Sequence, residues 1–484
     1  MQTHGEKNIV KTAPVNSLKT KIVCTIGPSC DSPDMIRSLI EKGMNVARLN
    51  FSHGSHDEHL EKITTIRKVS EEMGRSVAIL QDLCGPKIRV GKIKDPGISL
   101  KAGQSLILTS EDLLGEENRV SVSYKPLPSE VKKGDVILLA DGMMELIVHE
   151  ITGNDIVCDV IIGGTLTSNK GINLPSGTIK APSLTEKDRV DLDFGIKHDV
   201  DYIALSFVRT PEDVIGLKKI INQSGKDIPV VAKIEKHEAI TNIEGILDAT
   251  DAVMVARGDL GVEIPLEQVP ELQKMLVRKA NEKGKPVIVA TQMLRSMVDS
   301  PRPTRAEAND VANAVFDGAD AVMLSEETAS GSYPLAAVEY MAKIALNAEK
   351  GYPHDRYLTL TTHEPNIALS VAYASCILAE QLNASAIVAS TKSGFTAKQI
   401  SRFRPYSKIV ALSPDKKALR KLALYWGCEP GFVAIPNNTD EMIEKVAESA
   451  LETGAVQKGD LIVITGGHPV WVEGTTNMMK VKRL

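Results

Sequence analysis

The sequence predicts an α/β protein built around a (β/α)8 barrel, with a small β-barrel lid domain inserted into it and an α/β domain after it. Short apolar runs alternate with helical patterns over residues 18–86 and again over residues 183–350. Residues 87–182 instead carry short β-type runs separated by turn dipeptides such as Asp141-Gly142. A further alternation of helices and strands occupies residues 351–484.

The chain as a whole limits the class of protein. With 484 residues it is too long for a single core and indicates about three domains. Hydrophobic residues make up 43% of it and charged residues 25%, as in ordinary globular proteins. A net charge of −5 and an aromatic content of 4% argue against nucleic acid and membranes as partners. The six cysteines lack CxxC spacing, so neither disulfides nor zinc are expected.

The N-terminal residues show no recognisable targeting signal. Residues 1–17 are polar and lack the apolar centre of a secretory signal, so we interpret them as a tail. No apolar run approaches the about 18 residues of a membrane-spanning helix. A cytoplasmic location is therefore the expectation.

The first barrel segment has the order β-α-β-α-β. Ser32 followed by Pro33 provides an N-cap and a first-turn proline, so a helix is expected to begin there, and Gly43 ends it. The expected strands cover residues 21–26, 44–49 and 76–81, and the expected helices cover residues 35–42 and 57–73.

The second barrel segment supplies five more strands. Thr304 with Glu307 three residues later is a capping box at the start of one helix, and another helix is expected from Pro265 to Lys283. The expected strands cover residues 202–207, 230–234, 252–255, 287–290 and 321–324. Eight strands and the combined length of the two segments fit a (β/α)8 barrel of about 250 residues.

The insertion and the C-terminal domain differ from the barrel in their pattern of expected strands and helices. Strands of the insertion are expected over residues 105–108, 136–139, 146–148 and 156–162. Because it interrupts a βα loop, the insertion lies over the catalytic face and is expected to close as a lid, the alternative being an insertion without such a role. The C-terminal domain is expected to contain helices over residues 367–382, 396–403, 416–426 and 440–453, and strands over residues 386–390, 409–412 and 461–464.

Charged residues directly after two buried strands point to a site. Lys233 and Glu235 close one apolar run, and Asp259 follows the next. Such charges are costly to desolvate unless they serve a ligand or metal. The carboxylates suit Mg2+ and the lysine suits an anion, although a structural salt bridge at the barrel rim is the alternative.

The other strands also end in polar residues, and in a barrel of this kind those ends form the active face. The polar residues at these strand ends are Arg48, Asn50, Ser52, His53, Asp82, Arg257, Thr291 and Ser325. Taken singly, Arg48 could pair with a surface carboxylate, His53 could be an ordinary loop residue and Thr291 could cap a helix. Together they supply carboxylates, cations and small donors, which is the set that phosphoryl transfer requires.

Six segments resemble pyruvate kinases closely. They are KIVCTIGP at residues 21–28, MNVARLNFSHG at 44–54, KIE at 233–235, MVARGDLG at 254–261, ATQM at 290–293 and MLSEETA at 323–329. The resemblance spans nearly the whole chain. It implies a barrel with a lid after its third strand, a C-terminal regulatory domain, a homotetramer, and transfer of a phosphoryl group from phosphoenolpyruvate to ADP, giving pyruvate and ATP.

The resemblance also assigns roles to residues. It makes Glu235 and Asp259 the ligands of Mg2+, with Mn2+ as an alternative ion, and Lys233 the cation that stabilises charge on the phosphoryl group and the enolate. Arg48 would face the transferring phosphoryl group, and Thr291 would lie near the carbon that gains a proton. The remaining substrate-binding residues would be Gly258 and Ser325, and the nucleotide-binding residues Asn50, Ser52, His53, Arg89 and, from the lid, Lys170.

One segment departs from the usual family pattern. Residues 82–89 read DLCGPKIR where DTKGPEIR is usual, so Lys87 replaces an acidic residue. The region that would hold a monovalent cation comprises Asn50, Ser52, Asp82 and Leu83. We expect the Lys87 ammonium to replace that cation beside Asp82, so that K+ is not required; the alternative is a solvated surface lysine. A family branch with Leu and Lys at these two positions is interpreted in the same way.

The loop STKSGFT at residues 390–396 is the expected effector site. It offers hydroxyls, a lysine and free backbone N–H groups at the start of a helix near Thr396, an arrangement suited to phosphate. A glycine-rich loop at 466–476, after the last expected strand, would cover a phosphorylated sugar or nucleotide monophosphate. The expected contacts are Thr391, Lys392, Ser393, Gly394 and Thr396, unless the hydroxyls merely cap the helix.

Two other functions fit parts of the pattern. A barrel aldolase would form a Schiff base at Lys233, although the neighbouring carboxylates argue against it. A catalytically silent sugar-phosphate sensor would keep the fold without the activity. The sequence favours the kinase over both.

Overall fold

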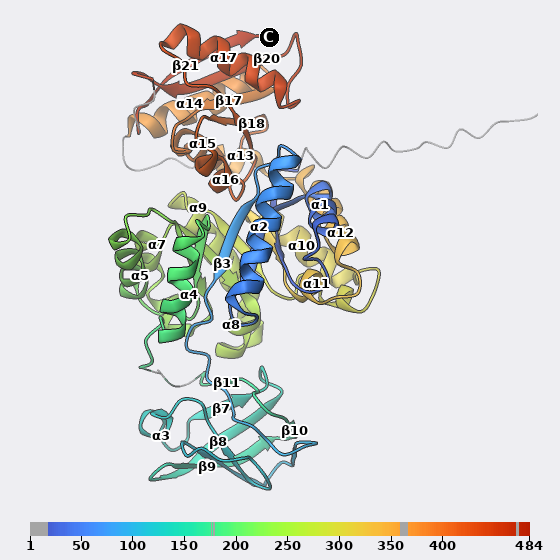
Figure 1. The fold of residues 1–484 in the computed structure, drawn as a ribbon, viewed down its shortest axis with the longest axis vertical. Coiled ribbons are helices and arrows are strands. Elements are labelled where there is room, and N and C mark those ends of the chain that lie inside the picture. The colour runs from blue at the N-terminus through green and yellow to red at the C-terminus, as the bar shows by residue number, and fades with distance from the viewer. Residues whose placement is uncertain (1–17, 176, 178–179, 359–365, 471–473) are drawn as a thin grey trace, which may run out of the picture.

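The computed structural model describes residues 18–175, 177, 180–358, 366–470 and 474–484, so the expected tail at residues 1–17 lies outside it. Its central unit is a closed barrel of parallel strands in the order β1-β16-β15-β14-β13-β12-β3-β2, surrounded by helices (Figure 1). This confirms the predicted fold class, a (β/α)8 or TIM barrel. The strands are β1 (Lys21–Thr25), β2 (Met44–Asn50), β3 (Ala78–Asp82), β12 (Tyr202–Leu205), β13 (Val230–Ile234), β14 (Ala252–Ala256), β15 (Val287–Ala290) and β16 (Ala321–Leu324).

Burial explains why these strands are so apolar. Every residue of β1, β3 and β12 to β16 is buried, because one face lines the barrel interior and the other packs on the helices. The interior layer includes Val23, Val46, Leu80, Met254 and Ile288, all at most 1% exposed. Polar residues are therefore tolerated only where a strand ends.

The helices begin where the sequence provides caps. Ser32 accepts a hydrogen bond from the Met35 amide, and Thr304 forms the predicted capping box with Glu307. The helix expected from Pro265 begins at Val269, because a 3-10 turn (Leu266–Gln268) precedes it. The barrel helices are α1 (Pro33–Lys42), α2 (His56–Glu72), α4 (Glu186–Lys197), α5 (Pro211–Gln223), α6 (His237–Thr241), α7 (Ile243–Ala249), α8 (Arg257–Glu263), α9 (Val269–Glu282), α10 (Arg305–Asp317), α11 (Glu326–Ala329) and α12 (Pro334–Glu349).

The insertion, expected as a small β-barrel, contains a six-stranded sheet, β11-β7-β8-β9-β5-β6, and a two-stranded sheet, β10-β4. It lies beyond one end of the barrel, with β11 nearest to it (Figure 1), and has its own core around Leu106 and Leu146. Its elements are β4 (Ile98–Leu100), β5 (Ser105–Thr109), β6 (Arg119–Ser121), α3 (Leu127–Glu130), β7 (Val136–Leu139), β8 (Met144–Thr152), β9 (Asp155–Ile162), β10 (Gly164–Leu166) and β11 (Ile172–Asn173).

The C-terminal domain is a five-stranded sheet in the order β19-β18-β17-β20-β21, flanked by helices. Sequence reasoning missed its two edge strands, because β19 contains Pro430 and Gly431 and the eight residues of β21 are mostly exposed, with three charged side chains among them. The expectation that residues 461–464 form the last strand was therefore wrong. The elements are α13 (His354–Leu358), α14 (Ile367–Gln381), β17 (Ala386–Ser390), α15 (Phe395–Ser401), β18 (Lys408–Ser413), α16 (Lys416–Leu422), β19 (Cys428–Phe432), α17 (Thr439–Glu452), β20 (Leu461–Gly467) and β21 (Thr476–Arg483).

The C-terminal domain packs against the barrel at the end opposite the insertion (Figure 1). Arg404 forms a buried ion pair with Asp320, 2.8 Å away, just before β16. Lys21, the first residue of β1, donates to the Cys428 carbonyl at 2.7 Å. Within the described ranges, none of the helices combines the length and apolar character needed to span a membrane.

Candidate active site

Lys233 and Glu235 form the centre of the candidate site, at the C-terminal end of β13. The Lys233 ammonium lies 2.8 Å from Glu235 Oε1 and 3.3 Å from Asp82 Oδ1, and donates to Ser206 Oγ at 2.7 Å. The other Glu235 oxygen accepts a hydrogen bond from the Phe207 amide at 2.8 Å. Lys233 is therefore held by two carboxylates and a hydroxyl at the C-terminal end of β13.

Arg48 is held in the same cluster from the other side. Its Nε donates to Asp82 Oδ2 at 2.7 Å, and Nη1 donates to Thr25 Oγ1 at 2.9 Å. Asp82 is 1% exposed, so this pairing is shielded from water. One buried carboxylate thus fixes both cations predicted to face the phosphoryl group.

The charges in the cluster shift each other's pKa values. Burial lowers the pKa of Lys233, but Asp82 and Glu235 outweigh it and raise that pKa above its ordinary value. Burial raises the pKa of Asp82, but Lys233 and Arg48 bring it below its ordinary value. Lys233 therefore remains an ammonium and Asp82 a carboxylate at neutral pH.

Helix α8 brings Gly258 and Asp259 to the same end of the barrel. The Gly258 amide donates to Thr291 Oγ1 at 2.7 Å, and a Cβ at Gly258 would lie 3.3 Å from that oxygen, closer than an ordinary contact. Thr291 is not the N-cap residue of α8, although its hydroxyl accepts from the first turn of that helix; it has a φ of +71°, and its carbonyl accepts from Arg257 Nη2 at 2.8 Å. Arg257 thus ties the start of α8 to the segment that follows β15, and Gly258 and Thr291 lie side by side.

Ser325 follows β16 at the same rim. Its amide donates to Glu327 Oε2 at 2.7 Å, and its Oγ is buried without a hydrogen-bond partner among the residues that the structure describes. An unpaired buried hydroxyl beside the site is consistent with a contact to bound substrate.

The two carboxylates predicted to bind metal lie close enough to act on each other. Burial raises the pKa of Glu235, Lys233 opposes this, and the charge of Asp259 raises it further, so the net shift is upward. A divalent cation would relieve this repulsion. Because Mg2+ takes one or two protein carboxylates and completes its shell with water and phosphate oxygens, these donors fit that ion.

Lys87 lies in the site, but not where we expected. Its ammonium is 3.3 Å from Asp259 Oδ1, whereas Asp82 pairs with Arg48 and Lys233. Leu83 is buried, and its amide bonds to the Ala204 carbonyl, so its side chain belongs to the barrel core. The predicted contact between Lys87 and Asp82 is therefore wrong, because the chain turns toward α8 on entering the insertion.

The predicted nucleotide-binding residues form two separate groups in the contacts of the described chain. Asn50, Ser52 and His53 share one turn after β2, where Asn50 Oδ1 accepts from the Ser52 amide at 3.1 Å. Arg89 lies in the insertion, where Nη1 donates to the Asn169 carbonyl at 3.0 Å, beside Lys170. One group thus lies at the barrel rim after β2 and the other in the insertion.

Comparisons with known proteins agree over almost the full length. Residues 17–338 match the family model "Pyruvate kinase, barrel domain", and residues 369–482 match "Pyruvate kinase, alpha/beta domain". The chain belongs to the pyruvate kinase family. It is 44% identical to the pyruvate kinase of Clostridium acetobutylicum, covering 96% of this chain and 99% of that one.

Two further relatives support the same assignment. The pyruvate kinase of Staphylococcus aureus strain MRSA252 is 48% identical over 96% of this chain and 80% of its own. The crystal structure of a pyruvate kinase from Cryptosporidium parvum superposes with a TM-score of 0.91 at 38% identity, covering 97% of each chain. The chain is thus an enzyme of the pyruvate kinase type.

Sequence reasoning missed several residues of this pyruvate kinase site. Thr25 ends β1 and Ser206 directly follows β12, which is the same signal that identified Asp82, but neither residue was predicted. The contact of the Phe207 amide could not be predicted, because it depends on a φ of +56° that a phenylalanine in the sequence does not indicate. Glu327, which accepts from the Leu294 and Ser325 amides, lies inside a recognised motif yet was assigned no role.

The C-terminal loop of the pyruvate kinase chain forms a small pocket. Thr391, Lys392, Ser393, Phe395 and Thr396 line it together with Gly467 and Thr475. Helix α15 begins at Phe395, after Gly394 at a φ of +88°, and its N-cap makes no side-chain capping hydrogen bond within the described part of the chain. Thr396 Oγ1 is bonded to Thr476 Oγ1 at 2.7 Å, so its hydroxyl joins the two loops. Residues 471–473 of the second loop lie outside the described residues.

Proposed function

We propose that this chain transfers the phosphoryl group of phosphoenolpyruvate to ADP, giving pyruvate and ATP, with Mg2+ bound by Glu235 and Asp259. The observation that carries the proposal is the position of Lys233, held as an ammonium by Asp82 and Glu235. Phosphoryl transfer depends mainly on positioning and on neutralising charge on the transferring group. A fixed ammonium beside two potential metal ligands supplies both.

Each residue of the cluster then has a defined task. The ADP oxygen attacks phosphorus, the bond from phosphorus to the enol oxygen breaks, and the resulting enolate takes a proton at carbon. Lys233 and Arg48 lie where negative charge collects during this transfer, and Asp82 holds both of them in place. The bound Mg2+ would neutralise phosphate and carboxylate oxygens. Gly258 would contact substrate through its backbone, beside Thr291.

The aldolase alternative is disfavoured by the same cluster. A lysine that forms a Schiff base needs a lowered pKa, so that the free amine is present at neutral pH. Asp82 and Glu235 raise the pKa of Lys233 despite its burial. Treatment with substrate and borohydride should therefore leave Lys233 unmodified.

We also propose that K+ is not required, because Lys87 supplies a fixed positive charge at the site. This charge acts on Asp259, 3.3 Å away, rather than on Asp82. An ammonium there lies beside the proposed metal ligand, where it can offset negative charge that substrate and nucleotide bring in.

The C-terminal pocket is proposed as the site of a phosphorylated effector. Thr391, Lys392 and Ser393 line it, and among the described residues the helix that follows has no side-chain capping hydrogen bond, which disfavours a capping role for these residues. Effector binding should tighten phosphoenolpyruvate binding, and the coupling must be reciprocal, typically about 1–3 kcal/mol. Calorimetric titration with a panel of sugar phosphates and nucleotide monophosphates, using Thr391→Ala/Ser393→Ala as comparison, tests this. We further propose a homotetramer, which sedimentation can check.

The experiment that tests the main proposal is a coupled assay of pyruvate formation from phosphoenolpyruvate and ADP. Activity should require Mg2+ or Mn2+, and Glu235→Gln or Asp259→Asn should chiefly raise the ion concentration needed for half-maximal activity. Absence of pyruvate formation by the folded protein would favour the silent sensor.

A further inference from the structure

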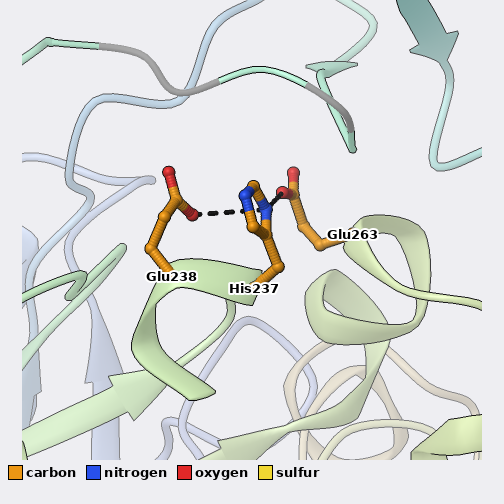
Figure 2. A group of neighbouring side chains, drawn as sticks. All are labelled: His237, Glu238 and Glu263. Atoms are coloured by element: carbon orange, nitrogen blue, oxygen red, sulfur yellow. Dashed lines mark ion pairs between the residues drawn. The ribbon is translucent and has the colours of Figure 1, made fainter. Parts of the chain in front are cut away.

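Three side chains outside the proposed catalytic centre come together at the barrel rim facing the insertion. His237 and Glu238 begin α6, and Glu263 ends α8. The imidazole lies between the two carboxylates (Figure 2), with Nδ1 3.3 Å from Glu238 Oε2 and 3.5 Å from Glu263 Oε2. One ligand atom from each residue lies within 4.8 Å of the others.

The polar atoms that face the centre of this cluster are not satisfied. The Glu263 side chain is 1% exposed, yet its Oε2 has no hydrogen-bond partner among the described residues. Both oxygens of Glu238 and Nδ1 of His237 are also buried without a hydrogen-bond partner there. His237 Nδ1 forms ion-pair contacts with one oxygen of each glutamate, but none of these atoms makes a hydrogen bond within the described residues, which costs about 1–3 kcal/mol for each buried polar atom and more for charged groups. These atoms therefore point to a ligand.

The other oxygen of Glu263 is fully engaged. Oε1 accepts from Lys236 Nζ at 2.8 Å and from Asn173 Nδ2, in β11 of the insertion, at 3.1 Å. These two donors fix the Glu263 carboxylate so that Oε2 is directed at His237. The orientation of this potential ligand is thus set by its surroundings and does not depend on an occupant.

The spacing of the cluster fits a four-coordinate metal ion. Zinc lies about 2.0–2.2 Å from imidazole nitrogen and carboxylate oxygen, which places two ligands of a tetrahedral site about 3.4 Å apart. The two distances from Nδ1, 3.3 and 3.5 Å, bracket that value. Ligands at right angles in an octahedral Mg2+ shell would stand closer, at about 3.0 Å.

We propose that His237, Glu238 and Glu263 bind a divalent transition-metal ion, Zn2+ in preference to Mg2+. An imidazole ligand favours such ions over Mg2+, which prefers oxygen. Lys236 balances one of the two carboxylates, so the cluster keeps a net negative charge that a cation offsets. The cysteines, whose spacing disfavours a zinc site of their own, take no part in this cluster.

An ion at this site would link the two segments that carry the proposed Mg2+ ligands. His237 stands two residues after Glu235, and Glu263 stands one helical turn after Asp259. Through Asn173, the same carboxylate contacts the insertion. The ion would therefore restrain both loops and the insertion. This inference goes beyond the proposed function and does not depend on it, because binding is measured directly.

The test is calorimetric titration of the full chain with Zn2+ in a large excess of Mg2+. We expect one Zn2+ per chain at this site, and at least about tenfold weaker binding in His237→Gln and in Glu238→Gln. His149→Gln, which alters an exposed histidine paired with Asp159 in the insertion, is the matched control and should bind as the native chain does. Because the His237 side chain is 33% exposed, its replacement is compatible with folding, which circular dichroism checks.

A second variant separates this site from the proposed Mg2+ site. Glu235→Gln/Asp259→Asn removes both proposed Mg2+ ligands and should retain the Zn2+ that His237→Gln loses. Zn2+ binding of undiminished affinity in His237→Gln would overturn the proposal. So would the absence of Zn2+ binding to the native chain, which would mean that a protonated His237 alone bridges the two carboxylates.

Discussion

The ammonium of Lys87 lies 3.3 Å from Oδ1 of Asp259, although the two residues are 172 positions apart in the sequence. The contact joins the segment that enters the insertion to the helix that carries a proposed Mg2+ ligand. Both side chains are 27% exposed, so the pair is weak enough to rearrange when ligands bind. Lys87 therefore brings a positive charge to Asp259 that can change partner when ligands bind.

The first prediction is that the enzyme works without K+. Rates of pyruvate formation in tetramethylammonium buffer should match those in potassium buffer, because the Lys87 ammonium is always present. Lys87→Glu reverses the charge beside Asp259 and should create a requirement for K+. Lys94→Glu is the control, since Lys94 pairs with Glu116 at an exposed position in the insertion. Strong activation of the native chain by K+ would contradict this role of Lys87.

The second prediction concerns Lys233. Lys233→Met removes a preorganised charge, so kcat should fall by at least about 10²–10³-fold with little change in KM. Steady-state kinetics of the coupled assay measure both constants. Lys285→Met is the matched control: its ammonium bonds to the Thr250 carbonyl, near the opposite ends of the barrel strands, and its loss should leave kcat nearly unchanged. A Lys233→Met variant with near-normal kcat would refute the role.

The third prediction is that Ser206 positions Lys233. Ser206 accepts from the Lys233 ammonium at 2.7 Å and donates to the Leu83 carbonyl at 2.7 Å. Ser206→Ala removes one of three contacts that hold the ammonium, so kcat should fall about tenfold, the equivalent of one hydrogen bond of about 1.4 kcal/mol. A decrease as large as that of Lys233→Met would instead indicate that Ser206 contacts substrate itself.

The sequence predicted the barrel well because burial on both faces restricts each strand to mainly apolar residues, which form a recognisable run. Strands β13, β15 and β16 match the expected ranges residue for residue. Strand β12 ends two residues earlier than expected, at Leu205, because the backbone changes direction there. Ser206 Oγ accepts a hydrogen bond from Lys233, and the Phe207 amide donates one to Glu235. The apolar pattern continues through Phe207, so it could not reveal that change of direction.

The parts that the sequence did not predict depend on contacts between distant residues. Helix α8 contains Gly258 and is short, and it is anchored by Arg257 bonding to the Thr291 carbonyl and pairing with Asp310. Strand β21 lies at the edge of the sheet beside β20, and its exposed side chains gave no apolar alternation. The partner of Lys87 was likewise undetermined, because the direction of the chain on entering the insertion follows from tertiary packing.

The fourth prediction concerns the ion pair between the barrel and the C-terminal domain. Arg404 donates to both Asp320 oxygens at 2.8 Å, and the two side chains are 1% and 5% exposed. Arg404→Met leaves Asp320 buried without its cation, which should cost about 3–5 kcal/mol of stability. Thermal unfolding followed by circular dichroism measures the loss. Arg402→Met removes a surface contact to the Glu282 carbonyl and should change the midpoint little; equal shifts for both variants would contradict the assignment.

The fifth prediction concerns His354, at the same domain junction. The imidazole is 4% exposed, and its Nδ1–H donates to the Arg404 carbonyl at 2.6 Å. Burial lowers the pKa of His354 from 6.5 to about 4; the hydrogen bond to Arg404 opposes this shift, and the positive charge of Lys19 reinforces it. The neutral imidazole is therefore the form that fits the fold.

The direction of the pH effect follows from proton binding. Between pH 6.5 and about 4 the unfolded chain protonates His354 while the folded chain does not, so acid favours unfolding in that window and has no such effect above it. His354 alone contributes a loss of at most about 1.4 kcal/mol per pH unit. His354→Asn keeps a donor for the Arg404 carbonyl and cannot titrate, so its midpoint of thermal unfolding should fall less steeply than that of the native chain from pH 6.5 to pH 4. If His354→Asn and the native chain lose stability in parallel, the acid sensitivity must arise from other groups, because a side chain that binds no proton cannot contribute to the slope.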